Sequence, residues 1–419
     1  MRILLASWGS SGDLIPFLSL GTALRARGHG VTLVGNPEWE ARAVAAGLRF
    51  VAAYREMAVS PLEAHPAIVG DHNFGLTSFR LLLETAIVPI LDETMAALER
   101  EAARHDLLVA HHFVFPAALV HEKTGIPWAT VALAPGVTPS ATDLPAGSLF
   151  QAGSGPLARL LQRLVWKMGT GALARIVDPP LNRLRAAHGL PPFRDHMFSA
   201  RSARLVLHLY SRHFAPPPRD WDGRHAVTGF CFDDAPVPPL PEAVERFLAA
   251  GLPPRLFTLG TTVVAHPRDF YRAAAASVAG GPGQERALLL VGREANIPAA
   301  LPPNVLAVDY LPHRAILPRC AAAAHQCGVG TLAEVLRAGI PAVACPFAFD
   351  QPNNAARLAR LGVARIARKS QRTAAGFRAA FAALEQGDAP RRARELAERI
   401  NAEDGPARAC EEIERRFGG

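Results

Sequence analysis

Short apolar runs alternate with amphipathic stretches along most of the chain. The first run, Arg2–Trp8, is continuous and ends at Gly9, which is typical of a strand buried on both faces of a parallel sheet. Residues 14–28 have helical spacing, with an apolar face, a basic last turn and a glycine stop. Further strands are expected at 31–34, 49–52, 106–110 and 128–133, with helices at 41–46 and through 121–123. This βαβαβ order predicts a doubly wound α/β domain with ligands at the carboxyl ends of its strands.

A second series of the same kind follows two proline-rich stretches, 214–218 and 233–241, which are semi-rigid connectors by composition. A strand at 226–231 is expected between these two stretches, and the strands of the second series are expected at 255–259, 287–291, 305–308, 322–325 and 342–345. The sequence therefore predicts two Rossmann-like domains facing each other across a cleft, residues 1–232 and 233–395. A helical segment, 396–419, is expected to pack back on the first domain.

Length and composition agree with a two-domain globular protein. The 419 residues exceed what one core accommodates, and no apolar run approaches the ~20 residues of a membrane span. The net charge is +8, but 42 of the 45 basic residues are arginines spread along the chain, with only 7% aromatic residues. This pattern argues against nucleic-acid binding and suits an anionic small molecule or an anionic membrane face.

Cysteine usage and the first residues indicate a cytoplasmic protein. The five cysteines are odd in number and form no C-x-x-C pair, which favours reduced core residues. The first residues have the pattern of a strand, not of a signal peptide. The 15 histidines show no metal-ligand spacing, and Asp220-Trp221-Asp222, a D-x-D triplet, lies in the proline-rich connector instead of at a strand end. No metal is expected.

The most informative segment starts at the strand that ends in His325. It continues through Gly328-Val329-Gly330-Thr331 into a helix that stops at Gly339. Glycines between a strand and a helix start let backbone N–H groups approach an anion, which the helix dipole also favours. His325 can donate a hydrogen bond to the same anion. The segment therefore predicts a phosphate site.

These residues resemble the donor-binding motif of family 1 glycosyltransferases, which have the GT-B fold. The usual motif is His-His-Gly-Gly-x-Gly-Thr, then a helix, then Asp-Gln-x-x-Asn-Ala; here Gln326-Cys327 replaces His-Gly, so a side chain is expected where backbone usually approaches the phosphates. Gly9–Phe17 matches the bacterial branch. Within the family, 121–127, 214–221 and 228–230 are most similar to the rhamnosyltransferases of rhamnolipid biosynthesis that build mono-rhamnolipids.

The resemblance implies a metal-independent, inverting glycosyltransferase with an acceptor-binding domain at 1–232 and a donor-binding domain at 233–395. Its nucleotide sugar is a substrate, so no cofactor is expected. The favoured substrates are dTDP-L-rhamnose and a 3-(3-hydroxyalkanoyloxy)alkanoate lipid, which would give a mono-rhamnolipid. The alternatives are a polyketide or peptide aglycone with a dTDP- or UDP-sugar, and a non-catalytic nucleotide-sugar-binding protein. A dinucleotide oxidoreductase is disfavoured, because the first turn lacks G-x-G-x-x-G and the second strand ends without an acidic residue.

The resemblance also implies donor-binding residues in the second half. The diphosphate would contact His325, Thr261 and the backbone of Gly328, Gly330 and Thr331. The base would lie against Tyr310, Leu311 and His313, and the sugar hydroxyls would bond to Asp350 and Gln351. Three alternatives stay open: Glu334 forms a capping box with Thr331 or binds a ribose, His313 is a surface loop residue, and Asp350-Gln351 is a turn before a helix.

Asp13 is the candidate base that takes the proton from the acceptor hydroxyl, and His325 with its helix would stabilise the departing diphosphate. The alternative for Asp13 is a helix cap. His111 and His112, at the end of another strand, are the second choice of base.

Acceptor-binding candidates are Ser11, His111, His112, Phe79 and Trp166. The last two lie in apolar stretches, 74–91 and 157–168, of a kind that is more often core. If these stretches face outward, a fatty-acyl acceptor and peripheral contact with the inner membrane follow, with Arg159, Arg163 and Lys167 for anionic headgroups.

Overall fold

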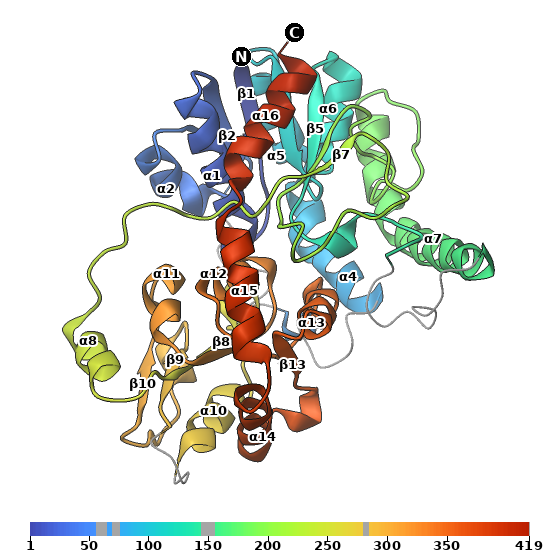
Figure 1. The fold of residues 1–419 in the computed structure, drawn as a ribbon. Helices are drawn as coiled ribbons and strands as arrows, with labels where there is room; N and C mark the ends of the chain where they lie inside the picture. Colours follow the sequence, from blue (N-terminus) through green and yellow to red (C-terminus); the bar gives the residue numbers. More distant parts are fainter. Residues whose placement is uncertain (56–64, 69–75, 144–155, 280–284, 419) are drawn as a thin grey trace. The chain divides into compact units, whose positions relative to one another are not determined.

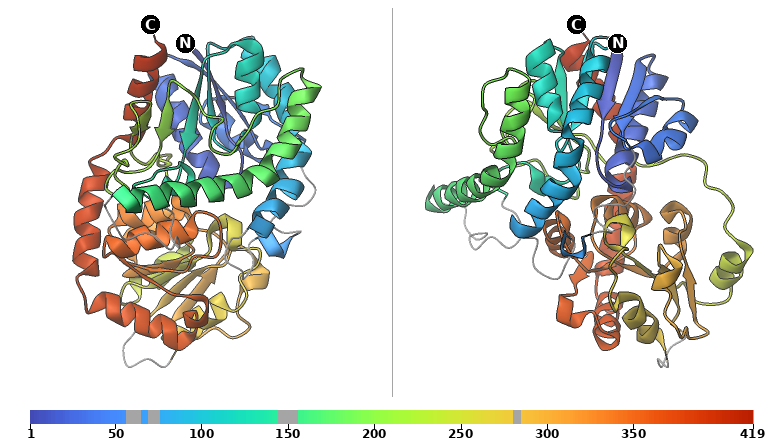
Figure 2. Two further views of the ribbon diagram at one scale, coloured as in Figure 1. Left: turned by 90° about the vertical axis from the view of Figure 1, so that its right-hand side faces the viewer. Right: turned by 180° about the vertical axis from the view of Figure 1, so that it is seen from behind.

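Two parallel sheets organise the chain in the computed structural model, which describes residues 1–55, 65–68, 76–143, 156–279 and 285–418. Unit 1 comprises Met1–Ala64, Gly75–Asp233 and Glu403–Gly419, and unit 2 comprises His65–Phe74 and Asp234–Ala402. Helices cover both faces of each sheet, as Figures 1 and 2 show. The predicted domain boundary at 232/233 lies one residue from the 233/234 boundary of the units.

The sheet of unit 1 has the strand order β3-β2-β1-β4-β5-β6-β7. All of its strand pairs are parallel. The strands are β1 (Arg2–Ala6), β2 (Gly30–Gly35), β3 (Arg49–Ala52), β4 (Leu107–His111), β5 (Trp128–Ala132), β6 (Val206–His208) and β7 (His225–Val227). The helices are α1 (Ser11–Ala26), α2 (Glu40–Ala45), α4 (Leu76–Leu82), α5 (Leu91–Ala102), α6 (Pro116–Thr124), α7 (Pro156–Ala187) and α16 (Gly405–Phe417).

The sheet of unit 2 has the order β10-β9-β8-β11-β12-β13, again all parallel. Its strands are β8 (Arg255–Thr258), β9 (Ala287–Leu290), β10 (Val305–Val308), β11 (Ala322–His325), β12 (Ala342–Ala344) and β13 (Ala364–Ile366). The helices are α8 (Glu242–Ala249), α9 (Gly260–Val263), α10 (Phe270–Val278), α11 (His313–Ile316), α12 (Val329–Ala338), α13 (Gln351–Arg360), α14 (Ala374–Glu385) and α15 (Ala389–Asn401).

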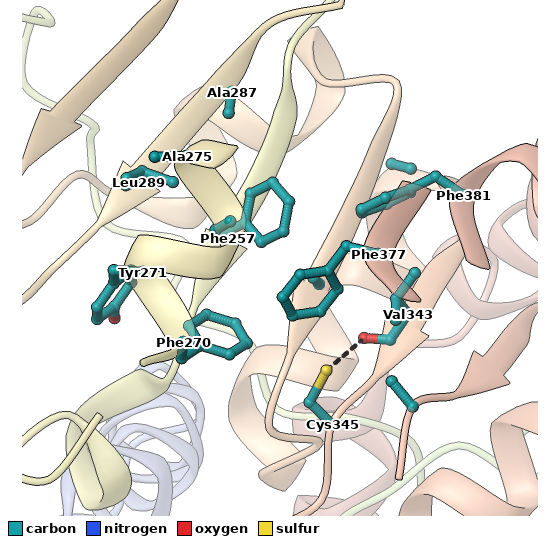
Figure 3. Close-up of a cluster of buried hydrophobic side chains, with 14 of the residues drawn as sticks. Phe257, Phe270, Tyr271, Ala275, Ala287, Leu289, Val343, Cys345, Phe377 and Phe381 are labelled. Atoms are coloured by element: carbon teal, nitrogen blue, oxygen red, sulfur yellow. Dashed lines mark hydrogen bonds between the residues drawn. The ribbon is translucent and has the colours of Figure 1, made fainter. Parts of the chain in front are cut away.

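Aromatic side chains hold the core of unit 2 (Figure 3). The fully buried Phe257 of β8 meets Phe377 and Phe381 of α14 edge to face, with ring centroids 5.4 and 5.6 Å apart. Such pairs add to the gain from burying apolar area. Truncation of Phe257 to alanine is therefore expected to cost about 3–5 kcal/mol of unfolding free energy.

The strand order places a ligand crevice in each unit. In unit 1, the chain runs from β1 to β2 on one side of the sheet and from β4 to β5 on the other side. In unit 2, it runs in the same way from β8 to β9 and from β11 to β12. In such sheets ligands bind outside the carboxyl ends of the strands at this switch point. The loops that follow these four strands contain the predicted base and the predicted phosphate site.

The C-terminal segment differs from the single helix expected at 396–419. It contains two helices, because the chain breaks at Ala402–Asp404: α15 packs on α12 in unit 2, and α16 packs on α1 in unit 1. The Asp404 carboxylate accepts a hydrogen bond from the Ala407 N–H and so caps α16. Position 405 has no room for a side chain, since a Cβ there would overlap the carbonyl group of Phe230.

Candidate active site

The Asp13 carboxylate is fixed over the loop that follows β1. Its Oδ2 accepts hydrogen bonds from the Ser10 N–H, at 2.8 Å, and from the Ser10 hydroxyl, at 3.1 Å. Gly9 has φ +120°, and a Cβ there would overlap Oδ2 of Asp13. A side chain at position 9 is therefore excluded by both strain and space. The N-cap of α1 is Ser10 and not Asp13, which lies at the third helical position and completes a capping box with Ser10. This contact orients the carboxylate without burying it, since the side chain stays 31% exposed.

The second choice of base faces the first. His111 Nε2 at the end of β4 lies 3.9 Å from Asp13 Oδ1. Burial lowers the pKa of His111 to about 3 and that of His112 well below its ordinary value. The ring nitrogens of both have no hydrogen-bond partner among the described residues. Burial therefore keeps both imidazoles neutral at neutral pH.

The predicted acceptor residues have different environments. Ser11 is half-buried in the first turn of α1, whereas Phe79 is 3% exposed and belongs to the core. The half-buried Trp166 packs edge to face on Phe198, with centroids 5.8 Å apart. Phe74 and Gly75, the start of the predicted apolar stretch, lie outside the described residues, as does the side chain of Arg159.

Sequence reasoning missed a small apolar recess in unit 1, lined in part by residues that follow β1, β3 and β4. It has a volume of about 20 Å³, room for roughly one water molecule, and its lining includes Trp8, Tyr54, Ile87, Thr94 and Phe113. The buried hydroxyl of Thr94 has no hydrogen-bond partner within the described parts of the chain. Trp8 and Phe113 belong to the loops after β1 and β4 and meet edge to face at 6.1 Å. No pattern along the chain indicates this recess, because several separate segments form it.

In unit 2, His325 is enclosed at the end of β11. Its side chain is 0% exposed, and Nδ1 accepts a hydrogen bond from the Cys327 N–H at 3.1 Å. Burial lowers the pKa of His325 to about 3, so the ring is neutral and its proton resides on Nε2. No described group accepts a hydrogen bond from Nε2.

Gln326-Cys327 replaces the His-Gly of the usual motif. The side chain of Cys327 does not lie at the N-terminus of α12, where the phosphates are expected. Cys327 has φ +68°, in the left-handed region that favours glycine, yet its side chain is fully buried. Its Sγ points to the His325 carbonyl oxygen at 3.6 Å, and burial raises the pKa of the thiol well above its ordinary value. The expectation of an intruding side chain is therefore wrong for Cys327, whose backbone adopts the conformation of a glycine at a cost of about 1–2 kcal/mol.

The glycine-rich loop leads directly into α12, whose N-cap residue is Gly328. Thr331 therefore lies at the third helical position, and the capping box predicted for Thr331 and Glu334 is not formed at this helix start. Gly330 lies in the same first turn, and Glu334 is half-buried one turn further along. Thr261 is exposed at the start of α9, directly after Gly260.

The residues predicted to contact the base and the sugar flank this loop. Tyr310 is 72% exposed and Leu311 is buried. His313 begins α11, and burial lowers its pKa to about 4. Asp350 directly precedes α13, and burial raises its pKa to about 6. Gln351 is buried, and its Oε1 accepts hydrogen bonds from the N–H groups of Phe347 and Ala348.

Asn354 connects the two halves of the predicted donor site, although no separate role was expected for it. Its Nδ2 donates to Asp350 Oδ2 at 2.6 Å and to the Cys327 carbonyl oxygen at 3.0 Å. The asparagine of the Asp-Gln-x-x-Asn pattern was the signal that could have indicated this role. This amide therefore fixes the predicted sugar contact relative to the glycine-rich loop.

The D-x-D triplet has a structural role at its first position. Asp220 accepts hydrogen bonds from the hydroxyls of Ser140 and Thr142 and from the Ala141 N–H. Across the described ranges, no group of three or more histidine, cysteine, aspartate or glutamate side chains is arranged to hold a metal ion. Within the same residues, no helix combines the length and apolarity needed to cross a membrane.

The sequence is similar to those of known glycosyltransferases. The family model "Erythromycin biosynthesis protein CIII-like, C-terminal domain" matches residues 284–415. The chain is 36% identical to an O-mycaminosyltylonolide 6-deoxyallosyltransferase from Streptomyces fradiae, over 99% of this chain and 97% of the relative. It is 30% identical to glycosyltransferase GtfE from Amycolatopsis orientalis, over 87% of this chain and 85% of the relative.

Solved structures show the same fold. A glycosyltransferase of kitacinnamycin matches with a TM-score of 0.73 at 24% identity, over 99% of this chain and 98% of that one. The spinosyn rhamnosyltransferase SpnG complexed with thymidine diphosphate matches with a TM-score of 0.69 at 18% identity, over 99% and 100% of the two chains. The two Rossmann-like sheets are therefore those of the GT-B fold. With the full-length similarity, this shows that the chain belongs to the family 1 glycosyltransferases, metal-independent enzymes whose substrate is a nucleotide sugar.

Proposed function

We propose that this glycosyltransferase moves a deoxysugar from a thymidine-diphosphate sugar to a hydroxyl group of a polyketide aglycone. The observation that carries the proposal is the 36% identity over nearly the whole chain to an enzyme named for a 6-deoxyallosyl group and the acceptor O-mycaminosyltylonolide. The matching family model, named for erythromycin biosynthesis, supports the same class of acceptor.

The donor would bind in unit 2, at the carboxyl ends of β8 and β11. The first turn of α12, with Gly328, Gly330 and Thr331, offers backbone N–H groups and a helix dipole to the diphosphate. The remaining donor-binding set is Thr261 and His325 for the diphosphate, Tyr310, Leu311, His313 and Glu334 for the nucleoside, and Asp350 and Gln351 for the sugar. Thymidine as the base is supported by the thymidine diphosphate complex of SpnG, and that enzyme's rhamnosyl specificity keeps L-rhamnose among the candidate sugars.

The proton would be taken in unit 1. Asp13 accepts the proton of the acceptor hydroxyl while the hydroxyl oxygen bonds to the anomeric carbon. The bond from that carbon to the diphosphate oxygen breaks on the opposite face, so the configuration inverts. The transition state has oxocarbenium character, and the charge on the departing diphosphate is stabilised by the N-terminus of α12. The carboxylate suits this task because Ser10 fixes one oxygen and His111, which is neutral, lies beside the other.

A β-hydroxyacyl lipid is the second candidate acceptor, and one observation favours it. Leu157, Leu160, Leu164 and Met168 of α7 are each more than half exposed, at 69, 63, 51 and 67%. Their spacing places them on one side of the helix, with exposed Arg163 and Lys167 near by. An apolar stripe beside basic residues suits acyl chains and a peripheral membrane contact, as in mono-rhamnolipid synthesis.

A donor and acceptor matrix tests the proposal. The wild-type enzyme would be incubated with dTDP-deoxysugars, dTDP-L-rhamnose or UDP-glucose, each with a macrolactone or a 3-(3-hydroxyalkanoyloxy)alkanoate, and products would be detected by mass spectrometry. We expect glycosylated macrolactone from a dTDP-sugar. Product with the lipid alone would replace the proposal by the second candidate, and turnover with UDP-glucose alone would overturn the choice of donor.

A further inference from the structure

Thr94, in the first turns of α5, belongs to the lining of the apolar recess of unit 1. The residue is 7% exposed, and its Oγ1 has no hydrogen-bond partner within the described parts of the chain. An unpaired buried hydroxyl costs free energy of folding, and folded proteins usually avoid this cost. The hydroxyl of Thr94 therefore calls for a partner that the chain itself does not supply.

Other helical threonines satisfy their hydroxyls within their own helix. Thr22 in α1 and Thr124 in α6 each donate to the carbonyl oxygen four residues earlier, at 2.9 and 2.7 Å. The corresponding residue for Thr94 is Ile90, the N-cap of α5, and no bond to its carbonyl forms. A threonine in a helix can turn its hydroxyl toward that carbonyl or away from it. Thr94 therefore forgoes the local partner that its two counterparts use.

The recess lies at the edge of the sheet where ligands bind in folds of this kind. Its lining includes Trp8, Tyr54 and Phe113, which follow the carboxyl ends of β1, β3 and β4. The switch point between β1 and β4 is at the same edge. The ring of Phe113 lies 5.7 Å from the ring of His111, whose Nε2 is 3.9 Å from Oδ1 of Asp13. Two side chains therefore connect the recess to the predicted base.

The size and the lining of the recess restrict the group that it can hold. Its volume of about 20 Å³ admits a group the size of one water molecule. None of the residues that line it carries a charge at neutral pH, so a charged group would be unpaired there. The Thr94 hydroxyl can both donate and accept a hydrogen bond. A neutral hydroxyl or carbonyl oxygen on a carbon skeleton fits these limits, with Trp8 and Phe113 as apolar walls.

We propose that the recess is a subsite for the acceptor, in which the Thr94 hydroxyl binds one neutral oxygen substituent of the polyketide aglycone. The proposal rests on the proposed function, since it concerns the acceptor of that reaction. Thr94 is a specificity residue in this proposal and takes no part in proton transfer. An acceptor that lacks the oxygen leaves the hydroxyl unpaired and is therefore disfavoured.

Urea unfolding tests whether the folded protein itself needs the hydroxyl. Thr94→Val keeps the branched shape and replaces the unpaired hydroxyl by a methyl group, which suits an apolar lining. We expect the midpoint of Thr94→Val to equal or exceed that of the wild type, whereas Thr124→Val, which loses a bonded hydroxyl, should have a lower midpoint. A midpoint lowered as much in Thr94→Val as in Thr124→Val would show that the folded protein satisfies the hydroxyl, and would overturn the inference.

Steady-state kinetics with the macrolactone that the wild-type enzyme glycosylates test the contact to the acceptor. We expect kcat/KM for the acceptor to fall about tenfold in Thr94→Val and to stay within about threefold in Thr94→Ser, which keeps the hydroxyl. The KM for the dTDP-sugar should not change, and Thr124→Val should leave both quantities unchanged. Unchanged kcat/KM for the acceptor in Thr94→Val would overturn the inference and leave the proposed function intact. A wild-type enzyme that glycosylates no macrolactone would overturn the proposed function itself.

Analogues of that macrolactone that each lack one oxygen identify the group in the recess. For one analogue, the wild-type kcat/KM should lie about tenfold below that of the parent macrolactone. Thr94→Val should show no such difference, because the hydrogen bond is already lost in this variant. If Thr94→Val discriminates among the analogues as the wild type does, the recess holds no oxygen of the acceptor and the inference fails.

Discussion

The two sheets share the order of their first six strands, with a seventh strand in unit 1, but they differ at their carboxyl edges. In unit 1, large side chains lie at the end of β4 and just after β1 and β4, among them His111, Trp8 and Phe113. In unit 2, β11 is built from alanines before His325, Gly260 is the first residue of α9, and Gly328 is the N-cap of α12. The first edge therefore offers side-chain chemistry and shape, and the second offers backbone N–H groups to an anion. Proton transfer and donor binding should accordingly be separable by mutation.

The largest effect is expected from Asp13→Asn. The change keeps an oxygen for the Ser10 N–H but removes the base, so kcat should fall about 10³-fold, within the range for a lost general base. Thymidine diphosphate affinity should stay unchanged if that ligand binds unit 2, as proposed above. Steady-state kinetics and calorimetry measure the two quantities, with the exposed Asp222→Asn as a control. Retained kcat in Asp13→Asn would end the assignment of proton transfer to unit 1.

Acidification should lower the free energy of unfolding of unit 1 more than that of unit 2. Burial lowers the pKa of His225 to about 4, as it does for His111 to about 3, and it lowers the pKa of His112 and His208 well below the ordinary value. His208 and His225 also stack on Trp221, with centroids 4.2 and 4.6 Å away. Because their folded-state pKa values are depressed, the stability of the neutral forms is present above the unfolded pKa near 6.5 and is lost as pH falls. At pH 5, each such histidine costs about 2 kcal/mol of unfolding free energy.

All five tryptophans lie in unit 1, so their fluorescence reports that unit alone. In unit 2, burial depresses the pKa of two histidines of the described residues, His313 and His325. Urea unfolding at pH 7.5 and 5 should therefore show a larger drop in midpoint by tryptophan fluorescence than by far-UV circular dichroism. Equal drops by both probes would contradict the difference between the units.

Two glycine substitutions should have smaller effects, one on kcat through unit 1 and the other on donor affinity through unit 2. Gly9→Ala displaces the Asp13 carboxylate and should lower kcat roughly tenfold, whereas Gly260→Ala displaces the Gln326 amide in the predicted phosphate site and should weaken thymidine diphosphate binding roughly tenfold. Gly125→Ala is the matched control, because Gly125 also has positive φ, +74°, but a Cβ placed there would meet no described atom within 4 Å. If each variant changed both kcat and affinity alike, backbone strain alone would explain the effects.

The smallest effect concerns Asp350. Burial raises its pKa to about 6, so a carboxylate that accepts from a sugar hydroxyl becomes available only as pH rises through that value. The kcat/KM for the donor should then rise across pH 6, and Asp350→Asn should remove this step with a loss of a few-fold at pH 8. Thymidine diphosphate lacks the sugar, so its affinity should show no such step. A step that persists in Asp350→Asn would assign it to another group.

The predictable part of the fold lies in its continuous apolar strands. The predicted strands at 2–8, 31–34, 255–259 and 322–325 agree with β1, β2, β8 and β11 to within two residues, because both faces of these strands are buried. β6 and β13 were missed: β6 lies in the apolar run 205–210, which only His208 interrupts, whereas β13 has an arginine at its centre and gives no run. The break before α16 was also missed, although Asp404-Gly405-Pro406 is a helix-start signal.

The candidate site likewise has a part that a local motif predicts and a part that depends on how distant segments come together. The phosphate site of unit 2 follows from a short continuous motif, because backbone N–H groups and a helix start are local features. The proximity of Asp13 and His111 depends on β1 and β4 being neighbours, which the chain does not show until the strand order is known. The enclosure of His325 depends on the conformation of Cys327, and a glycine-like φ in a cysteine leaves no mark in the sequence.

The helix α16 belongs to unit 1 but is synthesised last. Unit 1 starts at the first strand, yet its last helix follows the whole of Asp234–Ala402. During synthesis, the face of α1 that α16 covers stays open until unit 2 has left the ribosome. An exchange of unit 2 between related enzymes must accordingly respect two junctions, near 233/234 and 402/403, so that the recipient keeps its own α16.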